Sequence, residues 1–185
     1  MPDPTFAPSE RRSFLVPILL ALAALAAAIL IAIHFFPATT VNIEHLHTGV
    51  LPTETKLKGS YVVGLSEVDK VLYVASTIKV DNQTRAPLYL DGFHLTFTMP
   101  DDGEVTVQAA DKKDIPDLEL NFPALKPLLT TPLQTETLIE PSKSATGTVL
   151  FPLNRIDKAM WDQRKSAVIK VDLYHQPPVY VTIPK

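Results

Sequence analysis

The sequence predicts a mainly β protein, in which an N-terminal transmembrane α-helix precedes an antiparallel β-sandwich with one short helix. Two observations lead to this fold class. Residues 14–36 are apolar and carry no charged side chain, as a helix that crosses a bilayer requires. Beyond them, apolar residues recur at every second position in several short segments separated by turn residues, which is the pattern of half-buried strands.

The apolar segment 14–36 has the length of a single membrane span. At about 1.5 Å per residue it would extend roughly 34 Å, against a hydrocarbon core of about 30 Å. Ser13 can cap its start, Pro17 falls in its first turn, and Pro37 ends it. A cleaved signal peptide is disfavoured, because its apolar core would be shorter and Phe36 stands where a small residue is needed. We therefore expect an uncleaved signal anchor.

Positive charges predict the orientation of this anchor. Arg11 and Arg12 precede the helix, whereas the first basic residue after it is Lys56. By the positive-inside rule, residues 1–13 form a cytoplasmic tail and residues 37–185 form a domain outside the cytoplasm. The short tail and the lack of cysteine favour a bacterial protein. Its expected location is the cell inner (plasma) membrane, with the domain in the periplasm or at the cell surface.

Small residues recur four apart along the predicted anchor, for example at Ala23 and Ala27 and at Ala28 and Ala32. Such faces allow two helices to approach closely, so a homodimer through the helix is one interpretation. The other is that alanine is simply common in membrane helices. Both stay open.

Several segments beyond the anchor are expected to form strands. In 71–81, one face of the expected strand carries Leu72, Val74, Ile78 and Val80, and the other carries Tyr73, Thr77 and Lys79. This pattern indicates a half-buried strand. The other expected strands share this alternation or are short apolar runs bounded by turn residues. The full set is 41–47, 61–65, 71–81, 88–99, 105–109, 134–139, 145–153, 167–174 and 179–183.

Two local signals refine the strand pattern. The apolar parity of 88–99 reverses at Asp91-Gly92, which predicts a β-bulge because one extra residue reverses the side-chain alternation. Pro100–Gly103 has the composition of a tight turn and predicts a hairpin with the strand that follows it.

One helix is expected within the β domain, at 155–164. Asn154 can cap it and Asp157 suits its first turn. Many short antiparallel strands with a single helix indicate a sandwich of immunoglobulin-like, or fibronectin III-like, type.

Residues 111–133 do not fit a regular strand. Prolines interrupt the segment at positions 116, 123, 127 and 132, yet its other residues are too apolar for a solvated loop. One interpretation is a long crossover that caps the sandwich. The other is a surface that binds a partner or lipid, because long loops on rigid scaffolds often carry binding. The residues predicted for such a partner surface are Leu118, Leu120, Phe122, Leu125 and Leu128.

Composition and motifs argue against several functions. A net charge of −3 disfavours nucleic-acid binding, and Lys112-Lys113 and Arg164-Lys165 are too short to be basic tracts and are expected to lie on solvated faces. The absence of cysteine excludes disulfides, thiol catalysis and zinc–thiolate sites. His45 and His47 would share a face of a strand and could supply two metal ligands, but no third ligand can be assigned. No nucleophile elbow, phosphate loop or dinucleotide fingerprint is present. We therefore expect no catalytic residue, cofactor or metal, and a protein that is not an enzyme.

Two stretches of the sequence resemble the immunoglobulin-like extracytoplasmic domains of the water-stress (late-embryogenesis-abundant) type and the telokin-like domains of bacterial membrane-anchored proteins. The first is Val80-Asp-Asn-Gln-Thr-Arg-Ala-Pro-Leu88, an Asn turn with a Pro-Leu restart. The second is Pro141-Ser-Lys-Ser-Ala-Thr-Gly147-Thr-Val149-Leu-Phe151, in which Ser142 replaces the glycine usual after the proline. The resemblance implies the fold and a membrane-tethered setting, and it implies no substrate.

The function expected from the sequence is a non-catalytic interaction or envelope-stress module at the outer face of the membrane. An envelope protein would be its partner, and a structural subunit of a larger envelope complex is a related reading. The alternative is a ligand-binding or enzymatic extracytoplasmic domain that uses the 111–133 segment.

Overall fold

The computed structural model describes residues 15–35, 41–56, 68–129 and 131–185. The chain divides into two compact units, Met1–Ala38 and Thr39–Lys185, and each is described by itself. The first unit contains one helix, α1 (Leu15–Phe35), whose sequence is apolar throughout apart from one histidine. Judged on its described residues, the protein has no helix that is long and apolar enough to cross a membrane. The transmembrane assignment therefore stays a prediction from the sequence.

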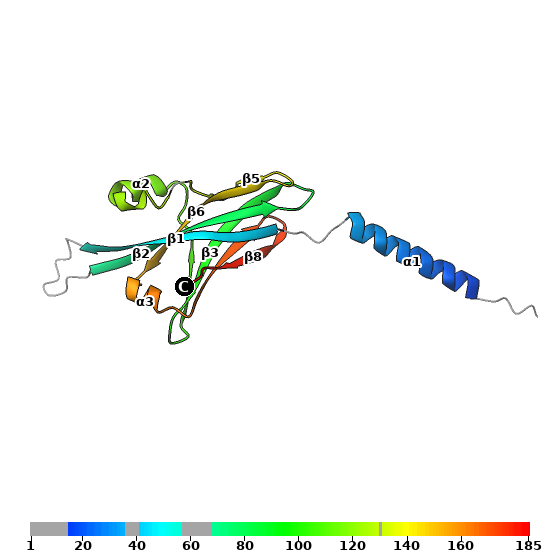
Figure 1. Ribbon diagram of the computed structural model, residues 1–185, viewed down its shortest axis with the longest axis horizontal. Helices are drawn as coiled ribbons and strands as arrows, with labels where there is room; N and C mark the ends of the chain where they lie inside the picture. Colours follow the sequence, from blue (N-terminus) through cyan, green and yellow to red (C-terminus); the bar gives the residue numbers. More distant parts are fainter. Residues whose placement is uncertain (1–14, 36–40, 57–67, 130) are drawn as a thin grey trace, which may run out of the picture. The chain divides into compact units, whose positions relative to one another are not determined.

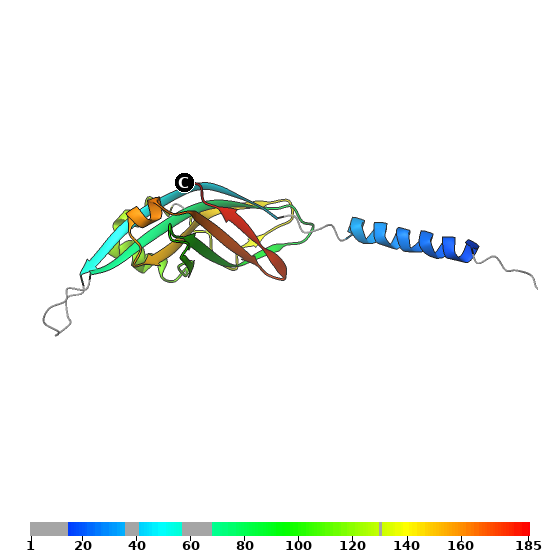
Figure 2. The ribbon, with the colours of Figure 1, turned by 90° about the horizontal axis from the view of Figure 1, so that it is seen from below.

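The second unit is an antiparallel β-sandwich with short helices, and its two sheets form the layers visible in Figures 1 and 2. One sheet has the strand order β1-β2-β6, and the other has the order β4-β3-β7-β8, with β5 paired to β3. The strands are β1 (Val41–Lys56), β2 (Val68–Asn82), β3 (Leu88–Thr98), β4 (Glu104–Gln108), β5 (Leu138–Ile139), β6 (Ser144–Asn154), β7 (Ser166–Leu173) and β8 (Gln176–Thr182). The helices are α2 (Ile115–Asn121), the 3₁₀ turn η1 (Pro123–Leu125) and α3 (Lys158–Asp162).

The main core lies between the two sheets and is built by alternate residues of each strand. Leu72, Val74, Ile78 and Val80 of β2 all have no exposed surface, as their shared parity predicts. Apolar residues of β3, β6 and β7 face them in the same alternation. The fully buried phenylalanines of this core are Phe93, Phe97 and Phe151.

A second, smaller core lies on the outer face of β2 and β6. Tyr73 and Ala75 of β2 and Leu150 of β6 pack there against Ile115 and Leu125. Strand β2 is therefore buried on both faces over this stretch. The prediction of a half-buried strand is wrong at Tyr73, because the alternation pattern cannot reveal a cover contributed by residues far along the chain.

Most predicted strands are confirmed with boundaries shifted by a few residues. The β-bulge at Asp91-Gly92 is confirmed, since the pairing of β3 with β7 shifts between Leu90 and Gly92. The turn at Pro100–Gly103 is confirmed, with the Met99 amide donating to the Gly103 carbonyl. The predicted strand 134–139 is reduced to β5, and the predicted strand 61–65 lies outside the described residues.

Two element boundaries depart further from the sequence-based expectation. Strand β1 extends from the predicted 41–47 to Lys56, pairing with β2 along its whole length. Helix α3 is shorter than predicted, and its N-cap is Asp157, whose carboxylate accepts a hydrogen bond from the Met160 amide at 2.8 Å. Asn154 instead ends β6.

The turn after β2 is organised by Asn82, which is 1% exposed. Its side-chain amide donates to the carbonyls of Ala86 and Ile139, and its Oδ1 accepts from the Thr84 amide. The backbone carbonyl of Asn82 accepts from Ser142, which has a left-handed φ of 58°. Ser142 therefore adopts the backbone conformation that the usual glycine would favour.

Candidate functional site

Residues 111–133 are here called the crossover. Its described residues pack against the outer face of the β1-β2-β6 sheet and provide half of the members of the second core: Ile115, Leu118, Phe122, Leu125, Leu128 and Leu129. Leu125 has no exposed surface, whereas Leu120 is 78% exposed. Leu118, Phe122 and Leu128 are half-buried against the second core. The structure thus brings four of the five predicted surface residues onto the sheet and leaves one in solvent. A partner surface made of these five stays a prediction.

The prolines that exclude strands from the crossover promote its helical turns. Pro116 occupies the first turn of α2 and Pro123 begins η1, positions where a missing amide costs little. Phe122 links the two turns, and its ring lies 5.4 Å from that of Tyr73, centroid to centroid. This contact places aromatic surface at the centre of the second core.

The crossover returns to the sandwich along β6. The Leu133 amide donates to the Thr148 carbonyl at 2.9 Å, and the Thr148 amide donates to the Thr131 carbonyl at 2.7 Å. Gly147 makes this approach feasible, because a Cβ there would lie 2.7 Å from the Thr131 oxygen and 2.8 Å from the Leu133 Cβ. Gly147, the glycine within Pro141–Phe151, is therefore needed for close packing of the backbone.

A hollow opens where the crossover leaves the sandwich and where it returns. Asp111, Lys112 and Lys113 form one wall, and residues 134–137 form the other, around a volume of about 690 Å³. We call this hollow the crossover groove. A small cavity of about 20 Å³, which shares Asp111 and Thr135 with the groove, is large enough for one water molecule. The crossover groove is a concavity with polar lining residues at the segment that the sequence predicts as a possible binding surface.

The charges of the crossover groove are solvated. Asp111 and Lys113 form an ion pair of 3.3 Å, with both side chains more than half exposed. An exposed pair of this kind contributes little energy, so it is readily rearranged around a ligand. In the part of the chain that the structure describes, no group of three or more His, Asp or Glu side chains could hold a metal ion. The groove can therefore bind polar or charged groups through exposed side chains and backbone.

The two histidines predicted to share a face do not share one. The pairing of β1 with β2 shifts between them, so that His45 faces Ile78 and His47 faces Thr77. Because neighbouring residues of β2 point to opposite faces, the two imidazoles do so as well. The bulge at Leu46, which was not predicted from the sequence, removes the basis for a paired metal ligand.

His45 joins a small polar cluster at the edge of the main core. Its Nε2 lies 2.7 Å from the Thr48 hydroxyl, which in turn donates to the Ser76 hydroxyl at 3.1 Å. Ser76 is completely buried. Burial, and secondarily the charge of His47, lowers the pKa of His45 below its ordinary value of 6.5. The cluster satisfies polar groups inside the sandwich.

Ion pairs line the outer face of the second sheet. Asp172 of β7 lies 2.8 Å from the Lys170 ammonium and 3.0 Å from Nδ1 of His94 on β3. The hydrogen bond to Asp172 raises the pKa of Lys170. The His94 contact lacks hydrogen-bond geometry. These three side chains of the face are polar and partly exposed.

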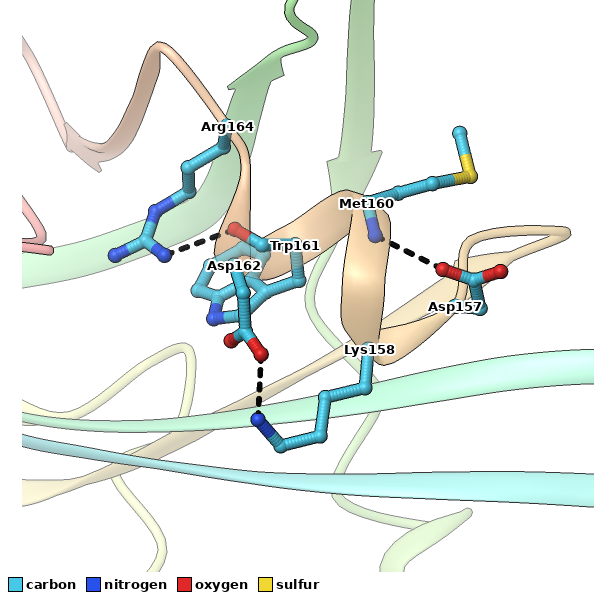
Figure 3. Close-up of polar contacts among 6 residues, drawn as sticks. All are labelled: Asp157, Lys158, Met160, Trp161, Asp162 and Arg164. Carbon is cyan, nitrogen blue, oxygen red and sulfur yellow. Dashed lines mark hydrogen bonds and ion pairs between the residues drawn. The ribbon is translucent and has the colours of Figure 1, made fainter.

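Arg164 is a buried cation that the sequence analysis placed on a solvated face. It is 5% exposed, and its guanidinium lies 4.2 Å from the ring centroid of Trp161. Figure 3 shows it donating to the Trp161 carbonyl, and a second donation reaches the Pro184 carbonyl. Burial lowers the pKa of Arg164, with the charge of Asp162 opposing the shift. The prediction was wrong because the short helix α3 turns this residue inward.

These features define a mainly β, antiparallel sandwich with one outer face covered by a crossover. No protein-family model and no curated protein matches the chain. Among solved structures, it resembles the yjhA protein from Bacillus subtilis, with 12% sequence identity, a TM-score of 0.43 and coverage of 80% of this chain and 94% of that one.

Two other similar structures are a functionally unknown protein from Listeria monocytogenes EGD-e and an uncharacterized β-sandwich protein from Clostridium difficile 630. The first has 12% identity and a TM-score of 0.43 over 78% of this chain and 77% of that chain. The second has 12% identity and a TM-score of 0.36 over 78% and 85%. These similarities are too distant to assign a family or a function.

Proposed function

We propose that this chain is a membrane-tethered, immunoglobulin-like β-sandwich that binds an envelope partner outside the cytoplasm, without catalysis. The observation that carries the proposal is α1, an uninterrupted helix of 21 residues without a charged side chain. It belongs to a unit separate from the sandwich, which has its own two cores. A helix of this composition satisfies its backbone internally and exposes apolar side chains, which suits a lipid environment.

The proposed tether would keep binding close to the membrane. Residues 36–40 are all that separates α1 from β1 in the sequence. Fully extended, so short a connection spans roughly 20 Å. A sandwich anchored in this way would act close to the membrane surface.

The anchor and its orientation can be tested on the full chain in bacterial membranes. We expect the protein to remain in the pellet after alkaline carbonate extraction. Protease added to spheroplasts should digest the β-sandwich without detergent. A charge-reversed variant, Arg11→Glu with Arg12→Glu, should lower the fraction digested, because it removes the positive residues that hold the tail inside. Release by carbonate would contradict the anchor, and protection until detergent is added would contradict the orientation.

Partner binding can be tested by crosslinking in native membranes followed by pull-down. A reproducible envelope partner would support the proposal, and loss of that partner on removing Leu120, the exposed leucine of the crossover, would place the contact there. A crosslink confined to a second copy of the chain would instead indicate a homodimer through the helix. No crosslinked species at all would contradict the interaction role.

The second candidate function is ligand binding at the crossover groove. Its polar walls and its volume of about 690 Å³ favour it, since small-molecule sites usually fall between about 300 and 1,000 Å³. Lys112→Gln and Glu136→Gln would change the charge of opposite walls without altering the core. A small charged ligand bound there would respond to these two changes in opposite directions. Equal, small effects of both would exclude a charged ligand.

A further inference from the structure

A second hollow, distinct from the crossover groove but sharing Glu136 with it, lies at the end of the sandwich where β3 begins. It has a volume of about 400 Å³. Tyr89, Leu90 and Asp91 of β3 line it together with Glu136 and Tyr174, the last from the turn between β7 and β8. We call it the tyrosine hollow.

Backbone hydrogen bonds hold the segments that carry Tyr89 and Tyr174. The Tyr174 amide donates to the Tyr89 carbonyl at 3.1 Å, and the Glu136 amide donates to the Leu90 carbonyl at 2.7 Å. Tyr89 is 47% exposed and Tyr174 is 58% exposed. Both rings therefore offer aromatic surface to the hollow from a backbone that holds their positions.

Two carboxylates accompany these rings. Asp91 and Glu136 are both exposed, and the ion pairs recorded for the described residues involve neither of them. The tyrosine hollow thus combines two aromatic side chains with two carboxylates outside these ion pairs. Both features attract a cation. The Tyr174 ring also lies 4.0 Å from that of His175, centroid to centroid.

We propose that the tyrosine hollow binds a quaternary ammonium cation, such as the trimethylammonium group of choline. This group carries a positive charge on an apolar surface and donates no hydrogen bond, so it can contact an aromatic face with a small loss of hydration. A primary ammonium is strongly hydrated and would lose more water on entry. A neutral apolar group would gain nothing from the carboxylates. The proposal is independent of the membrane anchor.

The ligand arm of the test uses the full chain in a maltoside detergent, which contains no choline group. Choline is titrated while the tyrosine side-chain resonances are followed by NMR. Its neutral isostere 3,3-dimethylbutan-1-ol and methylammonium serve as controls. We expect saturable shifts at Tyr89 and Tyr174 with choline, and binding at least several-fold weaker for both controls. Equal binding of the isostere would overturn the role of charge, and tighter binding of methylammonium would overturn the choice of a quaternary cation.

The variant arm separates this site from adventitious binding. Tyr174→Leu should weaken choline binding by about 2- to 30-fold, the range expected for loss of a cation–π contact. Asp91→Asn and Glu136→Gln should each weaken it by a smaller factor that shrinks at high salt. The matched control is Tyr180→Leu, which removes a tyrosine that is 62% exposed on β8 and does not line the hollow. An equal loss in Tyr180→Leu and Tyr174→Leu would overturn the proposal.

A last titration, with glycerophosphocholine, distinguishes a lipid headgroup from a free cation as the source of the quaternary ammonium group. Affinity equal to that of choline supports recognition of a lipid headgroup. Affinity at least several-fold weaker supports recognition of the free cation, because the added phosphate would then meet Asp91 and Glu136 unfavourably.

Discussion

The crossover offers a test in which two leucines of the same segment should behave in opposite ways. Leu125 is completely buried in the second core, whereas Leu120, five residues earlier, is 78% exposed. Leu125→Ala removes apolar groups from a packed site, and Leu120→Ala removes the same groups from solvent. The chemistry of the substitution is identical, so only packing can separate the two results.

The expected magnitude follows from burial. Truncating Leu125 loses the transfer free energy of its methyl and methylene groups and leaves a partial cavity, for a total of about 3 kcal/mol. For a domain of this size that corresponds to a fall in Tm of roughly 6 to 12 °C. Leu120→Ala should change the free energy of unfolding by less than about 0.5 kcal/mol.

The single tryptophan makes the assay informative about cooperativity. Trp161 lies in the main core, with its ring stacked 5.6 Å from that of Phe97, and it reports on the sandwich rather than on the crossover. If the two cores unfold as one unit, Leu125→Ala shifts the midpoint seen by Trp161 fluorescence and by circular dichroism equally. Equal, small effects of Leu125→Ala and Leu120→Ala on both signals would refute the packing of the crossover on the sheet.

Three further predictions test individual residues. Gly147→Ala should destabilise the domain by about 1 to 3 kcal/mol in urea unfolding, because the new methyl meets backbone atoms, whereas Gly92→Ala, whose Cβ would meet no atom closer than 3.6 Å, should not. Arg164→Ala should lower the free energy of unfolding by about 1 to 3 kcal/mol, because it removes the donor to the Pro184 carbonyl and one of the donors to the Trp161 carbonyl. The exposed Arg85→Ala is a neutral control, and equal effects of the two changes would contradict this role. The pKa of His45 is lowered in the folded state, so the unfolded chain binds the imidazole proton more tightly. The contribution of His45 to the free energy of unfolding should therefore be complete above pH 6.5 and should fall as the pH drops below that value. His45→Gln should reduce this dependence on pH. An unchanged slope would contradict the burial of this imidazole.

The sandwich could be predicted because its signals are local. A strand with one buried face alternates its apolar residues, and the reversal of that alternation at Asp91-Gly92 marked a bulge that the structure contains. The second bulge, at Leu46, was missed although the apolar parity also changes there between Ile43 and Leu46. Leu46 is 47% exposed, so its hydrophobicity carried no information about the core.

The crossover could be predicted only in part. Its prolines correctly excluded strands, but Pro116 directly after Ile115 also fits the first turn of a helix, which is how the structure uses it. Which of its leucines lie inward depends on the sheet that they cover, and no local pattern specifies that sheet. The same reason hid the burial of Tyr73 and of Arg164, since both contact residues brought close only by the fold.

The covered face also limits where ligands can bind on the sandwich. The crossover packs on the outer face of β2 and β6, and Glu136 lines both the crossover groove and the tyrosine hollow. Glu136 has a left-handed φ of 65°, a backbone conformation that few residues other than glycine adopt. Four other residues, among them Ser142 and His175, share that feature, so the backbone conformation alone does not mark a site. Glu136 differs from them in lining both hollows, so Glu136→Gln should alter binding at either one, whereas Asp91→Asn should act on the tyrosine hollow alone.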